Sequence, residues 1–235
     1  MEEILSRIAK APTLPLLWRQ MTRYFIRHGF GGVSYYWLRA GTNLPAVIPL
    51  QHGFTREQRA VYRSFDFQRL DIVPRAALVA GRPIRWSELW RGSEITAEER
   101  GFLAALRDAK VTDGFSLPCY GPNGRNAVVG LGRMTAKTDT GIDHLALLHF
   151  AAQAAHLRIC ALFTEDAPRE KHLSAREKEI LDWVARGKSN GVIAEILKIA
   201  PGTVDTYMRR IYEKLDVSDR TSAAVKGVGL GLIAA

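Results

Sequence analysis

Cysteine is scarce in this sequence, and its scarcity excludes several classes of protein. The chain of 235 residues holds two cysteines, Cys119 and Cys160, without the close pairing of a zinc site and without a preceding signal peptide. A disulfide framework of the kind found in small secreted domains is therefore excluded. The expected compartment is the reducing cytoplasm.

Patterns of catalysis and metal binding are missing as well. The sequence has no phosphate-binding loop and no acyl-transfer elbow, so an enzyme is a remote interpretation. Among six histidines, His149 and His156 share a helix face but lie two turns apart, and no carboxylate or cysteine completes a ligand set. We therefore expect neither a metal nor a catalytic cofactor.

A long uninterrupted apolar run is also absent. The longest apolar tract, residues 145–163, is interrupted by four polar residues, His149, Gln153, His156 and Arg158. A membrane-spanning helix needs about 20 predominantly apolar residues. We therefore expect an amphipathic core helix here and no membrane partner.

The composition that remains is that of a globular protein, with 47% hydrophobic residues, 24% charged residues and a net charge of +9. The length suits two domains. The polar segment 164–172 contains Pro168 and lies between two helical patterns, so we expect a linker there, between domains at 1–163 and 173–235. The basic excess is either a solvated surface or a source of diffuse attraction to DNA or an acidic partner.

Three short helices are expected in the last third of the chain. Ser174 and Glu177 form a capping box that begins the first helix, and Gly187 suits its C-terminal end. Asn190 is the expected cap of the second helix. Pro201 suits the first turn of the third helix, because the N–H that proline lacks has no partner at that position.

The third helix has two unlike faces. Its apolar stripe has a spacing of 4, 3 and 4 residues and consists of Val204, Met208, Ile211 and Leu215. The opposite face consists of Gly202, Thr206, Arg209, Arg210 and Glu213. Such a helix fits the major groove of DNA, where an arginine can bond two acceptors of a guanine edge. On spacing alone, an ordinary three-helix bundle with a solvated face remains open.

The first two-thirds of the chain alternate between helical and strand patterns. Helices are expected at residues 1–10, 15–28, 55–64, 74–80, 96–109 and 142–162. Strands are expected at residues 32–39, 46–50, 83–86, 115–120 and 127–132. Helices that bracket an antiparallel sheet make an α/β/α sandwich, so the expected class is α+β with a C-terminal all-α domain.

Residues 173–232 resemble the LuxR-type helix–turn–helix. The match comprises Leu-Ser-x-Arg-Glu-x-Glu-x-Leu from residue 173, Gly-Lys-Ser-Asn from 187, Ile-Ala-x-x-Leu from 193, Thr-Val from 203 and Ile-x-x-Lys-Leu from 211. The resemblance implies a four-helix DNA-binding domain whose last helix, about 221–233, forms a dimer contact. It implies base contacts from Asp205, Thr206 and Arg209. It implies phosphate contacts from Lys188, Ser189, Asn190, Thr203, Arg210 and Lys214.

Three residues depart from this family pattern at the third helix. Ala200 stands where the family usually has a serine cap, and Tyr207 stands where histidine is frequent. Asp205 stands where a basic or polar residue that contacts bases is common. A carboxylate there is unfavourable beside phosphate but can accept a hydrogen bond from a cytosine amino group. We therefore expect an unusual target sequence.

The front domain resembles LuxR-type autoinducer domains more weakly. Four of the six residues of their Trp-Tyr-Asp-Pro-Trp-Gly pattern match, and the six aligned residues are Gln58, Tyr62, Asp71, Ile72, Trp86 and Gly114. The family's Asp accepts a hydrogen bond from the amide N–H of an acyl-homoserine lactone, which is the role that the resemblance implies for Asp71. An alternative role for Asp71 is a helix or turn cap, since it precedes Ile72-Val-Pro74.

The departures in the front domain fall at the ligand's polar head. Gln58 replaces an indole donor, Phe54 lacks the hydroxyl of a frequent tyrosine, and Gly130 stands where serine or threonine is common. The site would lose hydrogen bonds of about 0.5–1.5 kcal/mol each and gain volume. The expected cavity, with Asp71 as its polar anchor and Gln58 as a weaker one, is lined by Phe54, Gln58, Tyr62, Asp71, Ile72, Trp86, Phe102, Phe115 and Gly130.

The resemblance implies a DNA-binding transcriptional regulator that is controlled by a small signal molecule, an acyl-homoserine lactone or a relative. The alternative is a ligand-independent regulator whose front domain serves dimerisation or protein–protein interaction. The expected partners are a two-fold symmetric double-stranded operator, a second copy of the chain in a homodimer, and RNA polymerase.

Overall fold

The computed structural model describes residues 2–39, 50–64, 70–90, 95–111, 113–165 and 173–233. The chain forms two compact units, one of residues 1–121 with 125–164 and one of residues 165–235 with 122–124. Two expected features, most of the strand at 46–50 and the linker residues 166–172, lie outside the described residues.

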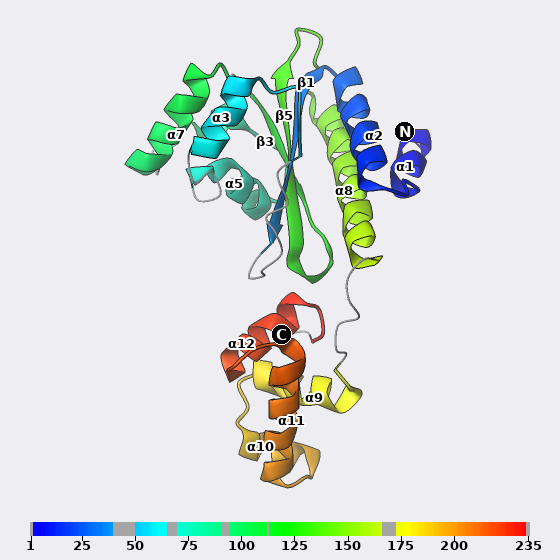
Figure 1. Cartoon of the computed structure of the whole chain (residues 1–235), viewed down its shortest axis with the longest axis vertical. Helices are drawn as coiled ribbons and strands as arrows, with labels where there is room; N and C mark the ends of the chain where they lie inside the picture. The colour runs from blue at the N-terminus through cyan, green and yellow to red at the C-terminus, as the bar shows by residue number, and fades with distance from the viewer. Residues whose placement is uncertain are drawn as a thin grey trace. The chain divides into compact units, whose positions relative to one another are not determined.

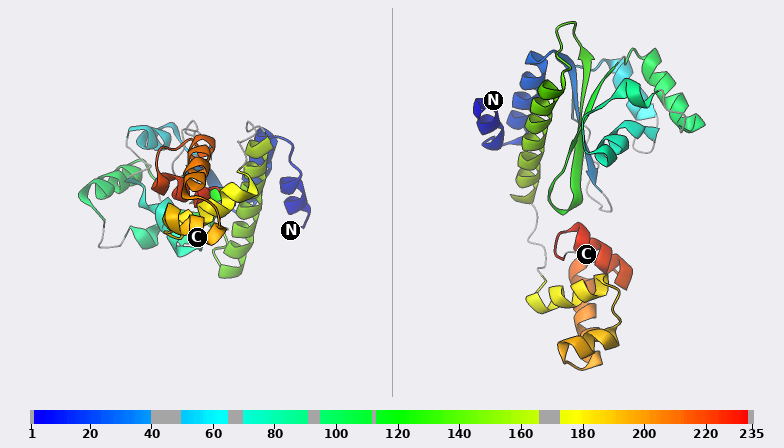
Figure 2. Two further views of the ribbon diagram at one scale, coloured as in Figure 1. Left: turned by 90° about the horizontal axis from the view of Figure 1, so that it is seen from below. Right: turned by 180° about the vertical axis from the view of Figure 1, so that it is seen from behind.

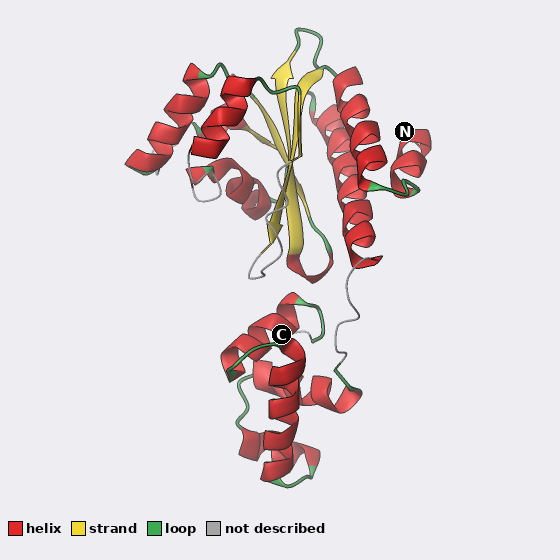
Figure 3. Cartoon of the chain, viewed as in Figure 1, coloured by secondary structure: helices red, strands yellow, loops and turns green. Residues whose placement is uncertain are grey.

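The first unit is built on a five-stranded antiparallel sheet (Figure 3). Its strands are β1 (Phe30–Arg39), β2 (Leu50–His52), β3 (Ile84–Arg85), β4 (Gly114–Cys119) and β5 (Arg125–Met134). They lie in the order β2-β1-β5-β4-β3. A short 3-10 turn, η1 (Pro122–Gly124), joins β4 to β5 in sequence.

Helices cover both faces of this sheet, which confirms the expected α/β/α sandwich (Figures 1 and 2). One face carries α1 (Glu2–Ala9), α2 (Leu14–Arg27) and α8 (Ile142–Glu165). The other face carries α3 (Arg56–Ser64), α5 (Ile72–Ala80), α6 (Trp86–Leu89) and α7 (Ala97–Asp108). The unit therefore has two separate interiors, one on each side of the sheet.

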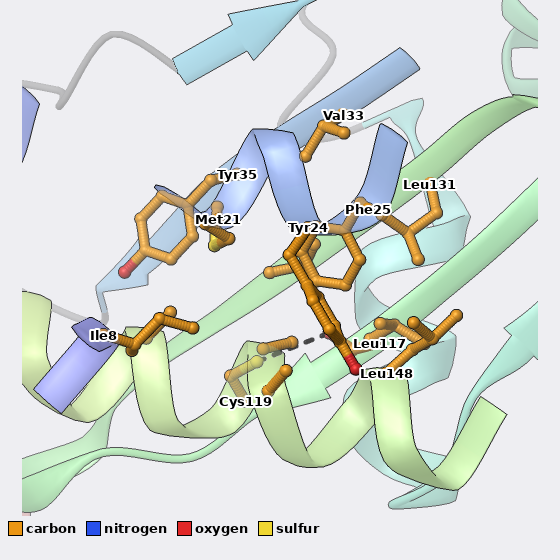
Figure 4. Close-up of a cluster of buried hydrophobic side chains, with 14 of the residues drawn as sticks. Ile8, Met21, Tyr24, Phe25, Val33, Tyr35, Leu117, Cys119, Leu131 and Leu148 are labelled. Carbon is orange, nitrogen blue, oxygen red and sulfur yellow. Dashed lines mark hydrogen bonds between the residues drawn. The ribbon is translucent and has the colours of Figure 1, made fainter. Parts of the chain in front are cut away.

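Strand alternation assigns each residue of the sheet to one interior. In β1, Val33 and Tyr35 join the core against α1, α2 and α8 (Figure 4). Ser34 and Tyr36 point to the opposite face. The long helix α8 buries Leu148, Ala152 and Ile159 in the first core. The stretch from Ile142 to Phe163, 22 residues long, is long and apolar enough to cross a membrane by length and composition alone. Within its apolar 18-residue window, however, 44% is buried inside the fold.

Two histidines of α8, His149 and His156, attach the helix to the sheet. The Nε2 atom of His149 lies 2.6 Å from the carbonyl oxygen of Pro118, and Nε2 of His156 lies 2.6 Å from that of Arg125. Because a carbonyl only accepts, Nε2 of His156 carries the proton, and the hydroxyl of Tyr35 donates to Nδ1 at 2.8 Å. Burial lowers the pKa of His156, which favours this neutral form. Among the described residues, no group of three metal-binding side chains occurs.

The second unit contains four helices, α9 (Ala175–Ala185), α10 (Asn190–Leu197), α11 (Pro201–Leu215) and α12 (Arg220–Gly229). The capping box of Ser174 and Glu177 forms as expected. The expected apolar stripe of α11 is buried throughout, and it packs with Ile180 and Leu181 of α9 and Ile193 of α10. This shared core holds α11 in place while its other face stays open to solvent.

The helix starts bear out two expectations and correct one. Pro201 lies in the first turn of α11, and Ala200 caps that helix without a side-chain hydrogen bond. The expected cap of α10 was Asn190, but the hydroxyl of Ser189 fills that role by accepting from the Val192 N–H at 3.4 Å. Asn190 is the first helical residue instead, because its side chain is engaged by residues of α11 and α12.

Candidate DNA interface and ligand site

The exposed face of α11 is the first candidate site. Thr203, Asp205, Arg209 and Arg210 are exposed there, opposite the buried stripe. Arg209 makes no hydrogen bond or ion pair with another part of the chain that the structure describes, so its guanidinium is available to an external acceptor. The guanidinium of Arg210 lies 5.8 Å from the ring centroid of Tyr207, which holds it along the helix.

The other residues expected at this interface are partly engaged within the fold. The hydroxyl of Thr206 donates to the carbonyl of Gly202 at 3.0 Å. The hydroxyl of Ser189 accepts from the Val192 N–H as a helix cap. The exposed side chain of Lys188 has no such partner among the residues with described placement. Arg209 and Lys188 are therefore two cations of this site whose side chains pair with no residue in the described part of the chain.

Lys214 holds the second unit together. Its Nζ donates to Oε2 of Glu177 at 2.7 Å, and the Glu177 side chain is only 3% exposed. Burial raises the pKa of Glu177, but hydrogen bonds from Lys214 and Ser174 more than offset this and hold the pKa below its usual range. Lys214, which was expected at a phosphate, thus forms an ion pair between α11 and α9 in this structure.

A chain of hydrogen bonds joins the starts of α10 and α12 to α11. The guanidinium of Arg220 donates from Nη1 to Oδ1 of Asn190 at 2.8 Å and from Nη2 to the carbonyl of Lys188. The Nδ2 of Asn190 donates to Oδ1 of Asp205 at 2.7 Å. Asn190 and Asp205 were expected at DNA, whereas Arg220 was not expected at the site.

The second candidate site lies on the sheet face under α3, α5 and α7. Its apolar cluster consists of Leu70, Val73, Trp86, Phe102, Leu103, Leu106 and Val111, with Val61, Tyr62, Ile72, Leu89, Trp90 and Ile95 packed against it. The ring of Tyr62 lies 5.7 Å from that of Phe102 and 6.0 Å from that of Tyr36, measured between centroids. The structure therefore brings Tyr62, Ile72, Trp86 and Phe102 together as the sequence predicted.

Asp71 is a buried carboxylate beside this cluster, with 9% of its surface exposed. Its Oδ1 accepts from the backbone N–H of Val73 at 3.1 Å, so it does cap α5 as the alternative interpretation required. That hydrogen bond is the only one its side chain makes with the described residues. Burial raises the pKa of Asp71 to about 7.

Gln58, the expected second anchor, makes its hydrogen bonds within the fold. Its Oε1 accepts from the Thr55 N–H at 3.0 Å, while its own N–H donates to the Thr55 hydroxyl at 3.2 Å, forming a capping box for α3. Its Nε2 donates to the carbonyl of Lys110 at 3.2 Å. The expected second anchor is thus committed to joining α3 to the end of α7.

The ring of Trp86 lies close to glycines of the sheet. A Cβ at Gly114 or at Gly132 would come within 2.8 Å or 2.9 Å of its ring. Its Nε1 donates to the hydroxyl of Ser116 at 3.0 Å. Gly114 and Trp86, which both match the family pattern, are therefore in contact, and a side chain at position 114 would overlap the indole ring.

The structure bears on two further residues expected at this face, Gly130 and Phe115, and corrects the second. At Gly130 the structure leaves no open space, because a Cβ there would meet the Ser34 hydroxyl of the neighbouring strand at 2.4 Å. Phe115 pairs with Leu131 in the sheet and belongs to the core on the opposite face, beside Phe30. A lining role for Phe115 would require a shift of one residue in β4.

Three polar residues of this face were not predicted as site residues. Ser34, Tyr36 and Ser116 are buried, and they come from β1 and β4 at alternate positions with the apolar core residues. The period of two in each strand is the signal that would have placed them there. Phe54, which was predicted, does lie over the sheet, because its ring would be 3.2 Å from a Cβ at Gly32.

Comparisons with known proteins identify both units. Residues 15–159 match the autoinducer binding domain family, and residues 171–226 match the luxR family of bacterial regulatory proteins. The chain is 33% identical over 163 residues to the HTH-type transcriptional regulator y4qH of Sinorhizobium fredii. These residues are 69% of this chain and 49%, about half, of the length of y4qH. It is 28% identical over 186 residues to the quorum sensing-dependent transcriptional regulator RpaR of Rhodopseudomonas palustris. These residues are 79% of this chain and 75% of RpaR.

Solved structures show the same fold. Escherichia coli SdiA superimposes with a TM-score of 0.74 at 21% identity, covering all of this chain and 98% of the other. SdiA in complex with octanoyl-rac-glycerol superimposes with a TM-score of 0.72 at 18% identity, covering 100% and 96%. Since the autoinducer family alone matches more than half of the sequence, the chain belongs to the luxR family of transcriptional regulators, with an autoinducer binding domain ahead of its helix–turn–helix.

Proposed function

We propose that this regulator is a cytoplasmic homodimer that binds two-fold symmetric DNA through α11 and is controlled by a small acyl molecule bound beside Asp71. The observation that carries the ligand proposal is Asp71 itself. A buried carboxylate with one N–H partner is unfavourable for folding, and an external donor would relieve that cost. A second buried group in the same cluster, Nε1 of Trp90, is a donor without a described partner.

Asp71, with its single described donor, and Trp90, with no described acceptor, define the chemistry of the proposed ligand. Asp71 requires a donor such as an amide N–H or a hydroxyl, whereas Trp90 requires an acceptor such as a carbonyl. The surrounding apolar and aromatic residues suit an acyl chain. An acyl-homoserine lactone satisfies both demands, and so does an acyl glycerol of the kind bound in the SdiA complex.

Thermal stabilisation by a panel of ligands tests this proposal. We expect the full chain to be stabilised by one or more acyl-homoserine lactones or monoacylglycerols. Ligand at a hundred times its Kd contributes about 2.7 kcal/mol, which shifts Tm measurably. Asp71→Asn should lose most of the shift, because Asn has one acceptor oxygen, and that oxygen is needed by Val73. If no member shifts the Tm of the wild type, the ligand proposal fails.

A ligand-independent regulator is the second candidate, and one observation favours it. The polar groups of Gln58 and Trp86, which align with the family's head-group residues, are satisfied within the fold. On this alternative, the first unit serves dimerisation. DNA binding by protein that carries no extractable small molecule would support it, and binding that requires an added acyl compound would exclude it.

Two substitutions test the proposed DNA interface. Arg209→Ala should weaken binding to the preferred operator by about 1–3 kcal/mol and relax specificity at one position, because Arg209 is proposed to contact a base. The matched control, Lys188→Ala, should weaken all DNA alike and lower the slope of log K against log salt by about one. Both are measured by fluorescence anisotropy at several salt concentrations. An unchanged preference in Arg209→Ala would show that the wrong face has been assigned.

Exposed apolar side chains on α8 and α12 support the homodimer. On α8, Leu147, Phe150 and Leu157 are 46%, 61% and 48% exposed and lie along one side of the helix. On α12, Val225 and Val228 are exposed, whereas Ala223 is buried within its own unit. We expect a dimer in sedimentation at micromolar concentration, on half-sites about 34–36 Å apart. Phe150→Glu should shift it toward monomer, and a monomeric wild type would refute the assembly.

A further inference from the structure

We propose that Asp205 selects a base pair by presenting one acceptor oxygen to a cytosine amino group, and that Asn190 and Arg220 hold it in that orientation. The inference rests on the proposed DNA-binding face of α11. It assigns Asp205 as the specificity residue and makes the other two its positioning residues.

A chain of side-chain contacts links α12, α10 and α11 of the second unit, the helices labelled in Figure 1. Arg220 at the start of α12 donates to Oδ1 of Asn190 at 2.8 Å and also to the carbonyl of Lys188. Asn190 at the start of α10 then donates from Nδ2 to Oδ1 of Asp205 at 2.7 Å. The two hydrogen bonds of the Arg220 guanidinium therefore fix the side chain of Asn190 against the first turns of α11.

The chemistry of the three groups determines which way each one faces. A guanidinium only donates hydrogen bonds and an ionised carboxylate only accepts them. The amide oxygen of Asn190 must therefore face Arg220, and its NH₂ must face Asp205. The second oxygen of Asp205, Oδ2, makes no hydrogen bond within the part of the chain that the structure describes, and the residue is exposed.

The position of Asp205 places that oxygen on the reading face. Asp205 precedes Arg209 by four residues, so the two side chains lie one turn apart on the same side of α11. In the major groove the cytosine amino group is a donor, whereas the guanine edge offers two acceptors that a carboxylate would repel. Adenine also has an amino donor there, but its N7 acceptor lies beside that group and would repel the carboxylate. A lone outward acceptor thus favours cytosine at one position of each half-site.

Substitution at Asp205 should invert this preference. In Asp205→Asn, the new side chain at position 205 must turn its amide oxygen toward the NH₂ group of Asn190. Its own NH₂ group then faces outward, toward the DNA. The variant then offers a donor to guanine, adenine or thymine acceptors and no acceptor to cytosine. In the double variant Asn190→Asp with Asp205→Asn, the carboxylate at 190 accepts from Arg220 and from the new amide. The amide oxygen at 205 then faces outward and should restore the preference for cytosine.

Selection from a randomised double-stranded DNA pool by the full chain tests these expectations. The wild type should prefer cytosine at one half-site position by about tenfold in Kd over the other bases. Asp205→Asn should lose that preference, and the double variant should regain most of it. Asp205→Ala should lose it without acquiring another. Lys188→Ala is the control, and it should weaken all sequences together and keep the cytosine preference.

Three outcomes separate the possible failures. If Asp205→Asn or Asp205→Ala enriches the same sequences as the wild type, Asp205 does not select a base. If the double variant melts at the wild-type temperature but does not regain the preference, Asn190 and Arg220 do not position Asp205. If the wild type itself enriches no sequence, the proposed DNA-binding face fails, which is a different result from either of the first two.

Discussion

Lys214→Ala is expected to destabilise the second unit by about 2–3 kcal/mol. The substitution leaves the Glu177 carboxylate, 3% exposed, with the Ser174 N–H but without its cationic partner. Removing one member of a buried ion pair leaves a charge that is no longer compensated. Since 1.4 kcal/mol is a factor of ten, amides of α9 and α11 should exchange with solvent about 30–150 times faster. Hydrogen exchange followed by peptide mass spectrometry measures this unit separately from the first.

The control and the pH dependence make this test specific. Lys178 is exposed on α9, so Lys178→Ala should change stability by less than about 0.5 kcal/mol. The pKa of Glu177 is lowered in the folded state, so its contribution is present above its ordinary pKa and is lost as pH falls through the folded value. The difference between Lys214→Ala and the wild type should therefore shrink below about pH 4. Equal exchange in the two lysine variants would contradict the role of the pair.

Asp71→Asn is expected to stabilise the ligand-free protein at pH 8 by about 2–4 kcal/mol. The folded-state pKa of Asp71 is raised to about 7 from 3.8. A group with a raised pKa contributes full stability below its unfolded pKa, and that stability is lost as pH rises through the folded value. At pH 8 the wild type carries the cost of a buried charge, whereas neutral Asn does not and can still accept from Val73. At 1.36 kcal/mol per pKa unit, the rise from 3.8 to about 7 limits the stabilisation by Asp71→Asn to about 4 kcal/mol.

Thermal melting at pH 8, 6 and 4 measures this effect. Tm of Asp71→Asn should exceed that of the wild type by roughly 5–10 °C at pH 8 and approach it at pH 4. Asp113→Asn is the contrasting control. Burial raises the pKa of Asp113, but hydrogen bonds from Arg85, Gly114 and Ser87 lower it below the usual range, so this variant should be destabilised at pH 8. An Asp71→Asn protein that melts at or below the wild type at pH 8 would show that Asp71 bears no such cost.

Local patterns in the sequence predicted much of the fold. Capping at Ser174, the start of α11 at Pro201 and the buried stripe from Val204 to Leu215 all depend on residues within one or two turns of each other. Alternating patterns likewise predicted the central strands. These features are local, so a single sequence contains the information for them.

The errors lie where distant residues decide between local alternatives. Ser189 and Asn190 are both good helix caps, and the choice depends on Arg220, thirty residues further along the chain. Lys214 is a surface lysine by pattern, yet it pairs with Glu177, 37 residues away. The Thr55-x-x-Gln58 capping box is visible in the sequence, but the contact of Gln58 with Lys110 is not. Such pairings are tertiary, and spacing within one helix does not contain them.

The contact between Trp86 and its glycines also constrains the order in which this site can change by mutation. With the indole in place, any side chain at Gly114 or Gly132 must displace the ring, because a Cβ would lie 2.8 Å or 2.9 Å from it. Once Trp86 is replaced by a smaller residue, Gly132 becomes free to vary, whereas a Cβ at Gly114 would still lie 2.3 Å from the carbonyl oxygen of Leu131. A side chain acquired at Gly132 would then block a later return to tryptophan. Loss of the indole would therefore become hard to reverse as soon as Gly132 acquired a side chain.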